Sequence, residues 1–175
     1  MASLFFLVLG LVVGAVHVFL DKQPRTKGRV AEIFLQWFLV VSVGLLSVVF
    51  FISHTVFADS SAASIGWPAG NPFQHEVAVA NLTIGTLGIL CYWMRGNFWI
   101  ATVIAFSVWW LGDAVVHIRS IVVEANYAPD NAGVMFYMDI LLPVILIALL
   151  AYYLHVNRQE EHDRIHSGSP TGQVV

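Results

Sequence analysis

The sequence has few charged residues, and basic residues are not in excess. Charged side chains make up 11% of the 175 residues, against about 25% in a typical soluble domain. Hydrophobic residues make up 58%, and the mean hydropathy is +0.78. Water does not keep so apolar a chain dispersed, so the lipid bilayer is the expected partner. The small net charge of -3 offers no basic surface, and no nucleic-acid partner is expected.

Cysteine is nearly absent as well. Cys91 is the only one, which excludes an intramolecular disulfide. It falls within an apolar run, where a buried and unreactive thiol is expected. Basic residues are also missing before the first apolar run, so that run lacks the charged start of a signal peptide. We therefore interpret it as a retained helix.

Long apolar runs dominate the rest of the chain. A helix needs roughly 20 apolar residues to cross a bilayer. Five runs meet this length, and a four-helix interpretation would leave one of them unplaced. The sequence predicts an all-α, integral membrane helical bundle with one transmembrane domain over residues 1–156. Its five transmembrane helices are expected at about 2–20, 30–57, 73–94, 98–118 and 134–156.

The distribution of Lys and Arg predicts the orientation. With the N-terminus outside, only Arg119 of the eight basic residues lies on the outer side. Cytoplasmic segments of membrane proteins are enriched in Lys and Arg, so this orientation in a cytoplasmic (inner) membrane is favoured. The polar residues 157–175 are expected to form a disordered cytoplasmic tail. The inner segments then carry Lys22, Arg25, Lys27, Arg29, Arg95, Arg158 and Arg164.

Ionisable residues gather near the outer ends of four predicted helices. Such groups are costly inside a bilayer, so they tend to face the bundle interior and to serve function. The antiparallel topology brings them to a similar depth, which predicts a shared site. Its expected members are Glu76, His117, Asp139, Asp113 and His54, supported by Asn81 and Gln74.

Spacing along two of these helices strengthens the prediction. Asp113 and His117 are four residues apart, so they share one helix face. Asp139 is followed four residues later by Pro143, which cannot donate the usual helical hydrogen bond to the carbonyl of Asp139. That carbonyl becomes available as a further ligand or acceptor.

Three chemistries fit this set of residues. Histidines with carboxylates bind divalent metals such as Zn, Fe or Mn. Buried carboxylates can instead carry protons. Haem between His54 and His117 is a weaker candidate, because the nearby carboxylates suit an apolar haem slot poorly.

Purely structural roles remain open for the same residues. Asp139 can cap a helix, and Asp113 and His117 can pair with each other and with Arg119. The negative charge of Glu76 can interact favourably with the dipole at a helix N-terminus.

A second polar set lies near the predicted inner face. Its members are His17, Glu32 and Gln36. We expect Glu32 to pair with the neighbouring basic loop. If it does not, the two polar sets would mark the ends of a path across the membrane, as a transporter requires.

Residues 66–146 resemble a known family. The resemblance is carried by Gly66-Trp67-Pro68, by Phe73-Gln74-His75-Glu76-Val77 and by Asn126-Tyr127-Ala128-Pro129. The family consists of uncharacterised small prokaryotic multi-spanning membrane proteins, a domain of unknown function, and it implies no activity or cofactor. Asp113 departs from the family pattern, in which a small residue is usual. The resemblance therefore favours Glu76, His117 and Asp139 as the core of the site.

We therefore expect an integral membrane protein whose carboxylate and histidine site binds a metal ion or protons. A small proton-coupled transporter is the alternative, as is an accessory structural subunit, in a homo-oligomer or with another membrane protein. A metal site should bring three or more donors to one point, and a transporter should show a polar path. A structural subunit should show paired polar groups and no empty pocket. If the protein is an enzyme, metal-dependent redox or hydrolytic chemistry is expected.

Overall fold

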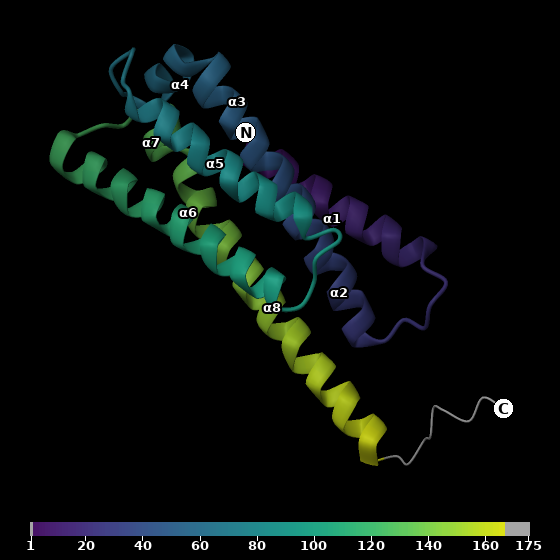
Figure 1. Cartoon of the computed structure of the whole chain (residues 1–175). Coiled ribbons are helices and arrows are strands. Elements are labelled where there is room, and N and C mark those ends of the chain that lie inside the picture. Colours follow the sequence, from purple (N-terminus) through teal and green to yellow (C-terminus); the bar gives the residue numbers. More distant parts are fainter. Residues whose placement is uncertain (1, 167–175) are drawn as a thin grey trace.

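A computed structural model describes residues 2–166, and these residues form helices and no strand. The all-α prediction is confirmed. Four helical segments are long and apolar enough to cross a membrane: Ala2–Leu20, Lys27–Val56, Asn97–Glu124 and Pro129–His166. Figure 1 shows the long helices packed side by side along one direction.

The first two apolar runs form helices close to the predicted bounds. Helix α1 spans Ala2–Leu20. The second run is one continuous segment made of α2 (Lys27–Trp37), the π-helix η1 (Phe38–Leu45) and α3 (Leu46–Val56). Helix α2 begins where Thr26 caps it, because the side chain of Thr26 accepts a hydrogen bond from the backbone N–H of Arg29.

Helix α5 (Phe73–Leu90) packs chiefly against α3 and η1. The contact is close because glycines meet at it. A Cβ atom added to Gly88 would lie 2.5 Å from the backbone nitrogen of Gly44. This segment is the third predicted span, and it is shorter and more polar than the four above, since it carries Gln74, Glu76 and Asn81.

Helix α6 (Asn97–Glu124) packs chiefly against α8 (Val134–His166). Helix α8 continues past the predicted span into the predicted tail, and Figure 1 shows it extending beyond the other helices. Glu160 secures this extension, because its carboxylate accepts a hydrogen bond of 2.8 Å from the N–H of Gly28. The remainder of the predicted tail, residues 167–175, lies outside the described residues.

The connection between α3 and α5 and the connection between α6 and α8 each contain a short helix. Helix α4 (Ala58–Ile65) ends at Gly66, whose φ of 83° places it in the left-handed region that glycine favours. Helix α7 (Pro129–Ala132) begins with a proline, which fits the first helical turn. The side chain of Asn126 ties the two connections together by donating to the carbonyl of Ile65 at 2.8 Å.

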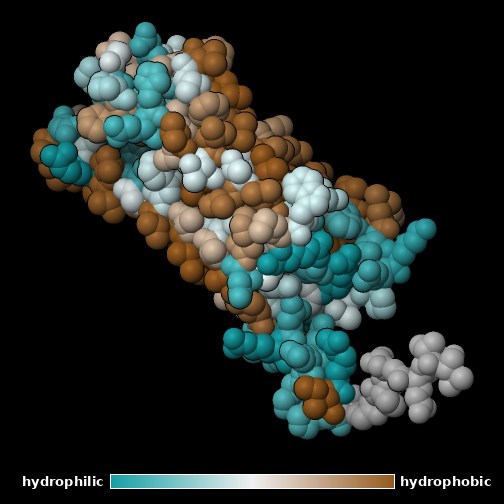
Figure 2. All heavy atoms as spheres, viewed as in Figure 1, coloured by the Kyte–Doolittle hydropathy of each residue, from teal (hydrophilic) through white to brown (hydrophobic). Residues whose placement is uncertain are grey.

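The ends of the bundle differ in character. The end that carries α4 and α7 is called the cavity end below. The opposite end, which carries Arg29, Arg95 and Glu160, is called the basic end. Figure 2 shows hydrophobic atoms along the flanks of the long helices and hydrophilic atoms gathered toward the two ends. Apolar side chains on these flanks are exposed, as in a protein surrounded by lipid; they include Phe5, Val8, Val108, Val122 and Ile104.

Candidate functional site

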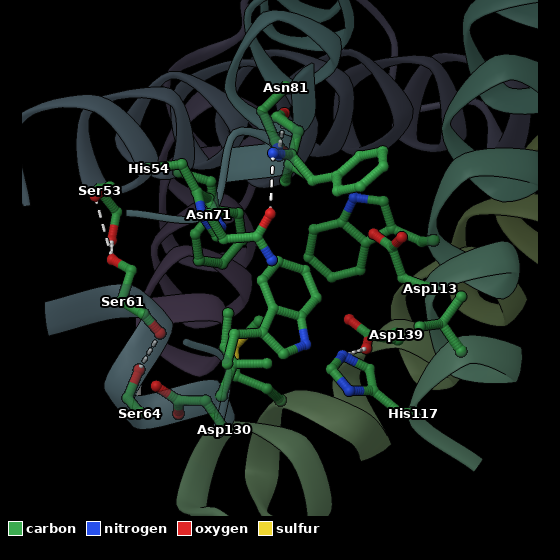
Figure 3. A pocket seen from close by; sticks show the side chains of 18 of the residues that line it. Ser53, His54, Ser61, Ser64, Asn71, Asn81, Asp113, His117, Asp130 and Asp139 are labelled. Carbon is green, nitrogen blue, oxygen red and sulfur yellow. Dashed lines mark hydrogen bonds and ion pairs between the residues drawn. The ribbon is translucent and has the colours of Figure 1, made fainter. Parts of the chain in front are cut away.

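A cavity of about 660 Å³ opens at the cavity end, and Figure 3 shows its lining. Helices α3, α4, α5, α6, α7 and α8 all contribute to it, so it lies where the second to the fifth predicted spans meet. Four of the predicted site residues line the cavity together with one predicted supporting residue: His54, Asp113, His117, Asp139 and Asn81.

His117 is held from both sides. Its Nδ1 atom lies 2.7 Å from Oδ1 of Asn131, and its Nε2 atom lies 3.4 Å from Oδ2 of Asp139. Asn131 is 1% exposed, and its own amide group donates to the carbonyl of Asn126 at 2.7 Å. Helix α7 therefore positions a histidine of α6 against a carboxylate of α8.

This geometry determines the tautomer of His117. The NH₂ group of Asn131 is used at the Asn126 carbonyl, so its oxygen faces the imidazole. An amide oxygen only accepts, so Nδ1 of His117 must carry a hydrogen and donate it. Any change in the protonation of His117 therefore takes place at Nε2, which faces Asp139.

Asp139 is buried, with 4% of the residue exposed. Its Oδ2 atom is inaccessible and makes no hydrogen bond within residues 2–166, although His117 lies nearby. A buried carboxylate oxygen without a donor is costly.

His54 on α3 is held by the same arrangement. Its Nδ1 atom contacts Oε1 of Gln74, and the Gln74 amide donates to the carbonyl of Ala58 at 3.1 Å. Nδ1 of His54 is therefore also the donor. Two cavity-lining histidines thus share one tautomer, and each can gain a proton only at Nε2.

Two further carboxylates line the cavity without a direct partner. Asp113 and Asp130 make no hydrogen bond or ion pair with other residues of the described chain. Arg119 also lines the cavity, but it pairs with Glu124 at 3.3 Å. Figure 3 shows Asp113, His117 and Asp139 close together, with Ser53, Ser61 and Ser64 across the cavity.

The structure does not bring every predicted residue into the cavity. Glu76 is exposed on α5 and does not line it. Asn81 does line it, but its amide donates to the carbonyl of Val77 in its own helix at 3.0 Å and not to another helix. Gln74 supports His54 from behind and is 1% exposed.

The geometry gives no support to the predicted metal site. Among residues 2–166, no group of three or more His, Cys, Asp or Glu side chains is arranged to hold a metal ion. A purely structural subunit was expected to show paired polar groups and no empty pocket. The structure differs from this expectation, because the side chains of Asp113 and Asp130 line a cavity and have no partner among the described residues.

The second polar set is paired, as expected for Glu32. Its carboxylate contacts Arg29 at 2.9 Å and also Arg95. Arg29 further pairs with Asp21, and its hydrogen bond holds the pKa of Asp21 below its usual value. His17 accepts a hydrogen bond from the indole of Trp37 at 2.8 Å. The transport path was expected only if Glu32 did not pair with the neighbouring basic residues. Glu32 does pair with them, so that condition is not met.

The sequence reasoning missed Asn131. Its only signal was its place in a polar connection of Asn126, Pro129 and Gly133, which is typical of a turn. Helix α7 and the bond to Asn126 turn this connection inward, where it meets His117.

Comparisons with known proteins give a family but no activity. No curated protein and no solved structure matches the chain. A family model described as "Family of unknown function (DUF6790)" matches residues 1–159, which extends well beyond the region of predicted resemblance. The chain belongs to this family of unknown function, DUF6790.

Proposed function

We propose that this protein is a five-span protein of the cytoplasmic (inner) membrane that binds and releases a proton at the His117–Asp139 pair. The pair lies in a cavity in the outer half of the bundle, with the N-terminus outside. The observation that carries the proposal is the contact of His117 Nδ1 with the side-chain oxygen of Asn131, because it leaves only Nε2, facing a buried carboxylate oxygen, to change its protonation.

The orientation is supported by the way the basic segments converge. Arg95, in the turn after α5, reaches Glu32 of α2, and Glu160 of α8 reaches Gly28. Three segments that carry Lys or Arg thus share the basic end. Ser3 donates to Met135, which lines the cavity, so the N-terminus lies at the opposite end. The positive-inside rule then puts the cavity outside.

The fifth span in this proposal is α5. Its first turn supplies Gln74 to the cavity end, and the turn after it supplies Arg95 to the basic end. A segment that joins the two ends of a membrane bundle crosses the bilayer. Gln74 and Asn81 are acceptable there because they are buried within the protein, and the exposed Glu76 lies in the first turn of α5, at the cavity end.

Proton binding follows from the cost of burying charge. An unprotonated Asp139 would leave Oδ2 both charged and without a donor in a site shielded from water. A single proton held between Oδ2 and Nε2 removes this cost. Loss of that proton would place a negative charge in the cavity beside Asp113, so the cavity charge changes with the state of the pair.

Proton counting tests this function. The protein in lipid nanodiscs would be titrated from acid to neutral pH, and the bound protons compared among wild type, D139N and E76Q. We expect D139N to hold a single proton fewer than wild type at neutral pH, because its side chain cannot share one with His117.

E76Q is the matched control. Glu76 is exposed and outside the cavity, so its substitution should not change the proton held by the His117–Asp139 pair. E76Q should therefore equal wild type at neutral pH. Equal proton content in D139N and wild type at neutral pH would overturn the proposal.

A further inference from the structure

We propose that the cavity binds a compact organic cation, an ammonium compound with an aromatic or other apolar body, in exchange for the proton of the His117–Asp139 pair. This inference rests on the proposed function and names the ligand class of the same site.

The charge of the lining selects a cation. The carboxylates of Asp113, Asp130 and Asp139 line the cavity, and none of them is paired with Lys or Arg among the described residues. The lining contains one guanidinium, that of Arg119, which is 69% exposed at its side chain and already pairs with Glu124. A positive ligand would therefore meet carboxylates that lack counter-ions, and an anion would meet repulsion.

Aromatic side chains favour an organic cation over a metal ion. Phe50, Trp67, Phe73 and Trp110 line the same cavity. Faces of aromatic rings attract ammonium groups, and they also cover an apolar ligand body. A metal ion would instead need three or more donors at one point, and residues 2–166 hold no such group.

The size of the cavity agrees with this class. A volume of about 660 Å³ falls within the range of roughly 300–1,000 Å³ that is typical of small-molecule sites. A bare metal ion would leave most of it empty. The lining also contains the hydroxyl groups of Ser53, Ser61 and Ser64, which can orient the ligand by hydrogen bonds.

Buried Asp139 couples the ligand to the proton. Its Oδ2 atom lacks a hydrogen bond and faces Nε2 of His117. When an ammonium group enters, the carboxylate can be neutralised by the ligand, and the proton of the pair is released. One positive charge enters and one leaves, so the net charge of the occupied cavity is unchanged. Cation and proton therefore compete for the same pair.

Calorimetric titration with benzyltrimethylammonium tests the inference. This probe carries a fixed charge on an aromatic body and has no proton of its own to lose. Binding to the protein in lipid nanodiscs would be measured at several pH values, with phenylacetate as the anion of similar size. We expect saturable binding of the cation and none of the anion. Its affinity should rise by about tenfold per pH unit where the pair is protonated, because one proton is displaced.

Four variants locate the site. D139N should lose the pH dependence and bind at least about tenfold more weakly, and D113N and W110L should also weaken binding. E76Q should bind as wild type does, since Glu76 lies outside the cavity. D113N keeps the inference testable if D139N does not fold, because Asp113 makes no hydrogen bond or ion pair in the described chain.

The outcomes separate this inference from the function on which it rests. Absence of cation binding with normal proton binding would overturn the inference alone. Equal binding of phenylacetate, or unchanged cation binding in D139N and D113N, would also overturn it. Stoichiometric binding of Zn²⁺ or Mn²⁺ that is lost in D139N, without binding of benzyltrimethylammonium, would make the cavity a metal site. Absence of the proton difference in D139N would overturn the proposed function itself.

Discussion

At the residue scale, Asn131 controls which nitrogen of His117 changes its protonation. Its amide is fixed by the Asn126 carbonyl, and its oxygen accepts from Nδ1 of His117 at 2.7 Å. Gln74 does the same for His54, with the carbonyl of Ala58 as its anchor. Both amides are buried, so in each histidine Nδ1 is positioned by a neutral group.

Substitution of Asn131 tests this role. N131A removes the acceptor of Nδ1 and should lower the free energy of unfolding by about 1–2 kcal/mol, because a buried donor loses its partner. It should also change the number of protons bound at neutral pH, since His117 can then adopt either tautomer. SDS titration in mixed micelles measures the first effect, and proton counting measures the second.

Asn97 provides a matched control for this substitution. It is exposed at the start of α6, so N97A should change the unfolding free energy by less than about 0.5 kcal/mol. The role of Asn131 would be refuted if N131A were as stable as N97A and bound protons as wild type does.

The site residues show what a sequence reveals at this scale. His54, Asp113, His117 and Asp139 were predicted chiefly from their depth, and the structure brings all four to one cavity. Glu76 was predicted by the same reasoning, yet it is exposed on α5. Depth follows from position along a helix, but the direction of a side chain depends on how the helix is rotated. The weak amphipathic pattern of α5 does not reveal that rotation.

At the element scale, the contact between η1 and α5 holds two apolar segments unusually close. Gly88 and Gly85 of α5 face Gly44 of η1, and small residues of this kind let two helices approach closely. The π-helix lies at this crossing. The close approach also positions the halves of α3 and α5 toward the cavity end, which supply His54 and Gln74.

Two glycine substitutions test the importance of this contact. G88A would place a Cβ atom 2.5 Å from the backbone nitrogen of Gly44, and it should lower the free energy of unfolding by about 1–3 kcal/mol through overpacking. G112A lies in α6 with no atom within 4 Å of the added Cβ. It should be neutral or stabilising by up to about 1 kcal/mol.

SDS titration in mixed micelles compares the two variants. Equal stability of G88A and G112A would show that α5 can move away from η1 without cost, contrary to the geometry described above.

Element boundaries were predictable where apolar runs are long. The first predicted helix matches α1, and the second matches α2, η1 and α3 within a few residues. Helices α4 and α7 were missed, because Ser, Gly and Pro dominate their surroundings and they depend on the tertiary bond from Asn126 to Ile65. The helical extension of α8 was missed because its anchor, Gly28, lies far away in the sequence.

At the scale of the whole molecule, apolar flanks separate a cavity end from a basic end. The family match supports no activity, so the proposed orientation rests on the distribution of basic residues, and the proposed function rests on the geometry of His117, Asn131 and Asp139. Composition and long apolar runs were sufficient to predict an all-helical bundle. The cavity was not predictable in shape, because six separate helices contribute to it.

The buried single cysteine makes orientation easy to test. Cys91 is 0% exposed, so a maleimide that cannot cross membranes should leave the wild-type protein unlabelled. Tyr127→Cys, in the exposed connection before α7, should react in intact spheroplasts. Glu161→Cys, near the end of α8, should react only after lysis. The reverse pattern would place the cavity on the cytoplasmic side and contradict the proposed topology.

The central claim concerns one proton between His117 and Asp139, and nitrogen NMR of the histidine rings tests it most directly. The protein would be labelled with ¹⁵N-histidine in lipid nanodiscs and followed through a pH titration, with H117Q to assign the signals. We predict that Nδ1 of His117 stays protonated throughout, that Nε2 alone changes, and that D139N shifts the midpoint of this change. A neutral His117 with its hydrogen on Nε2, or a midpoint unchanged in D139N, would contradict the account.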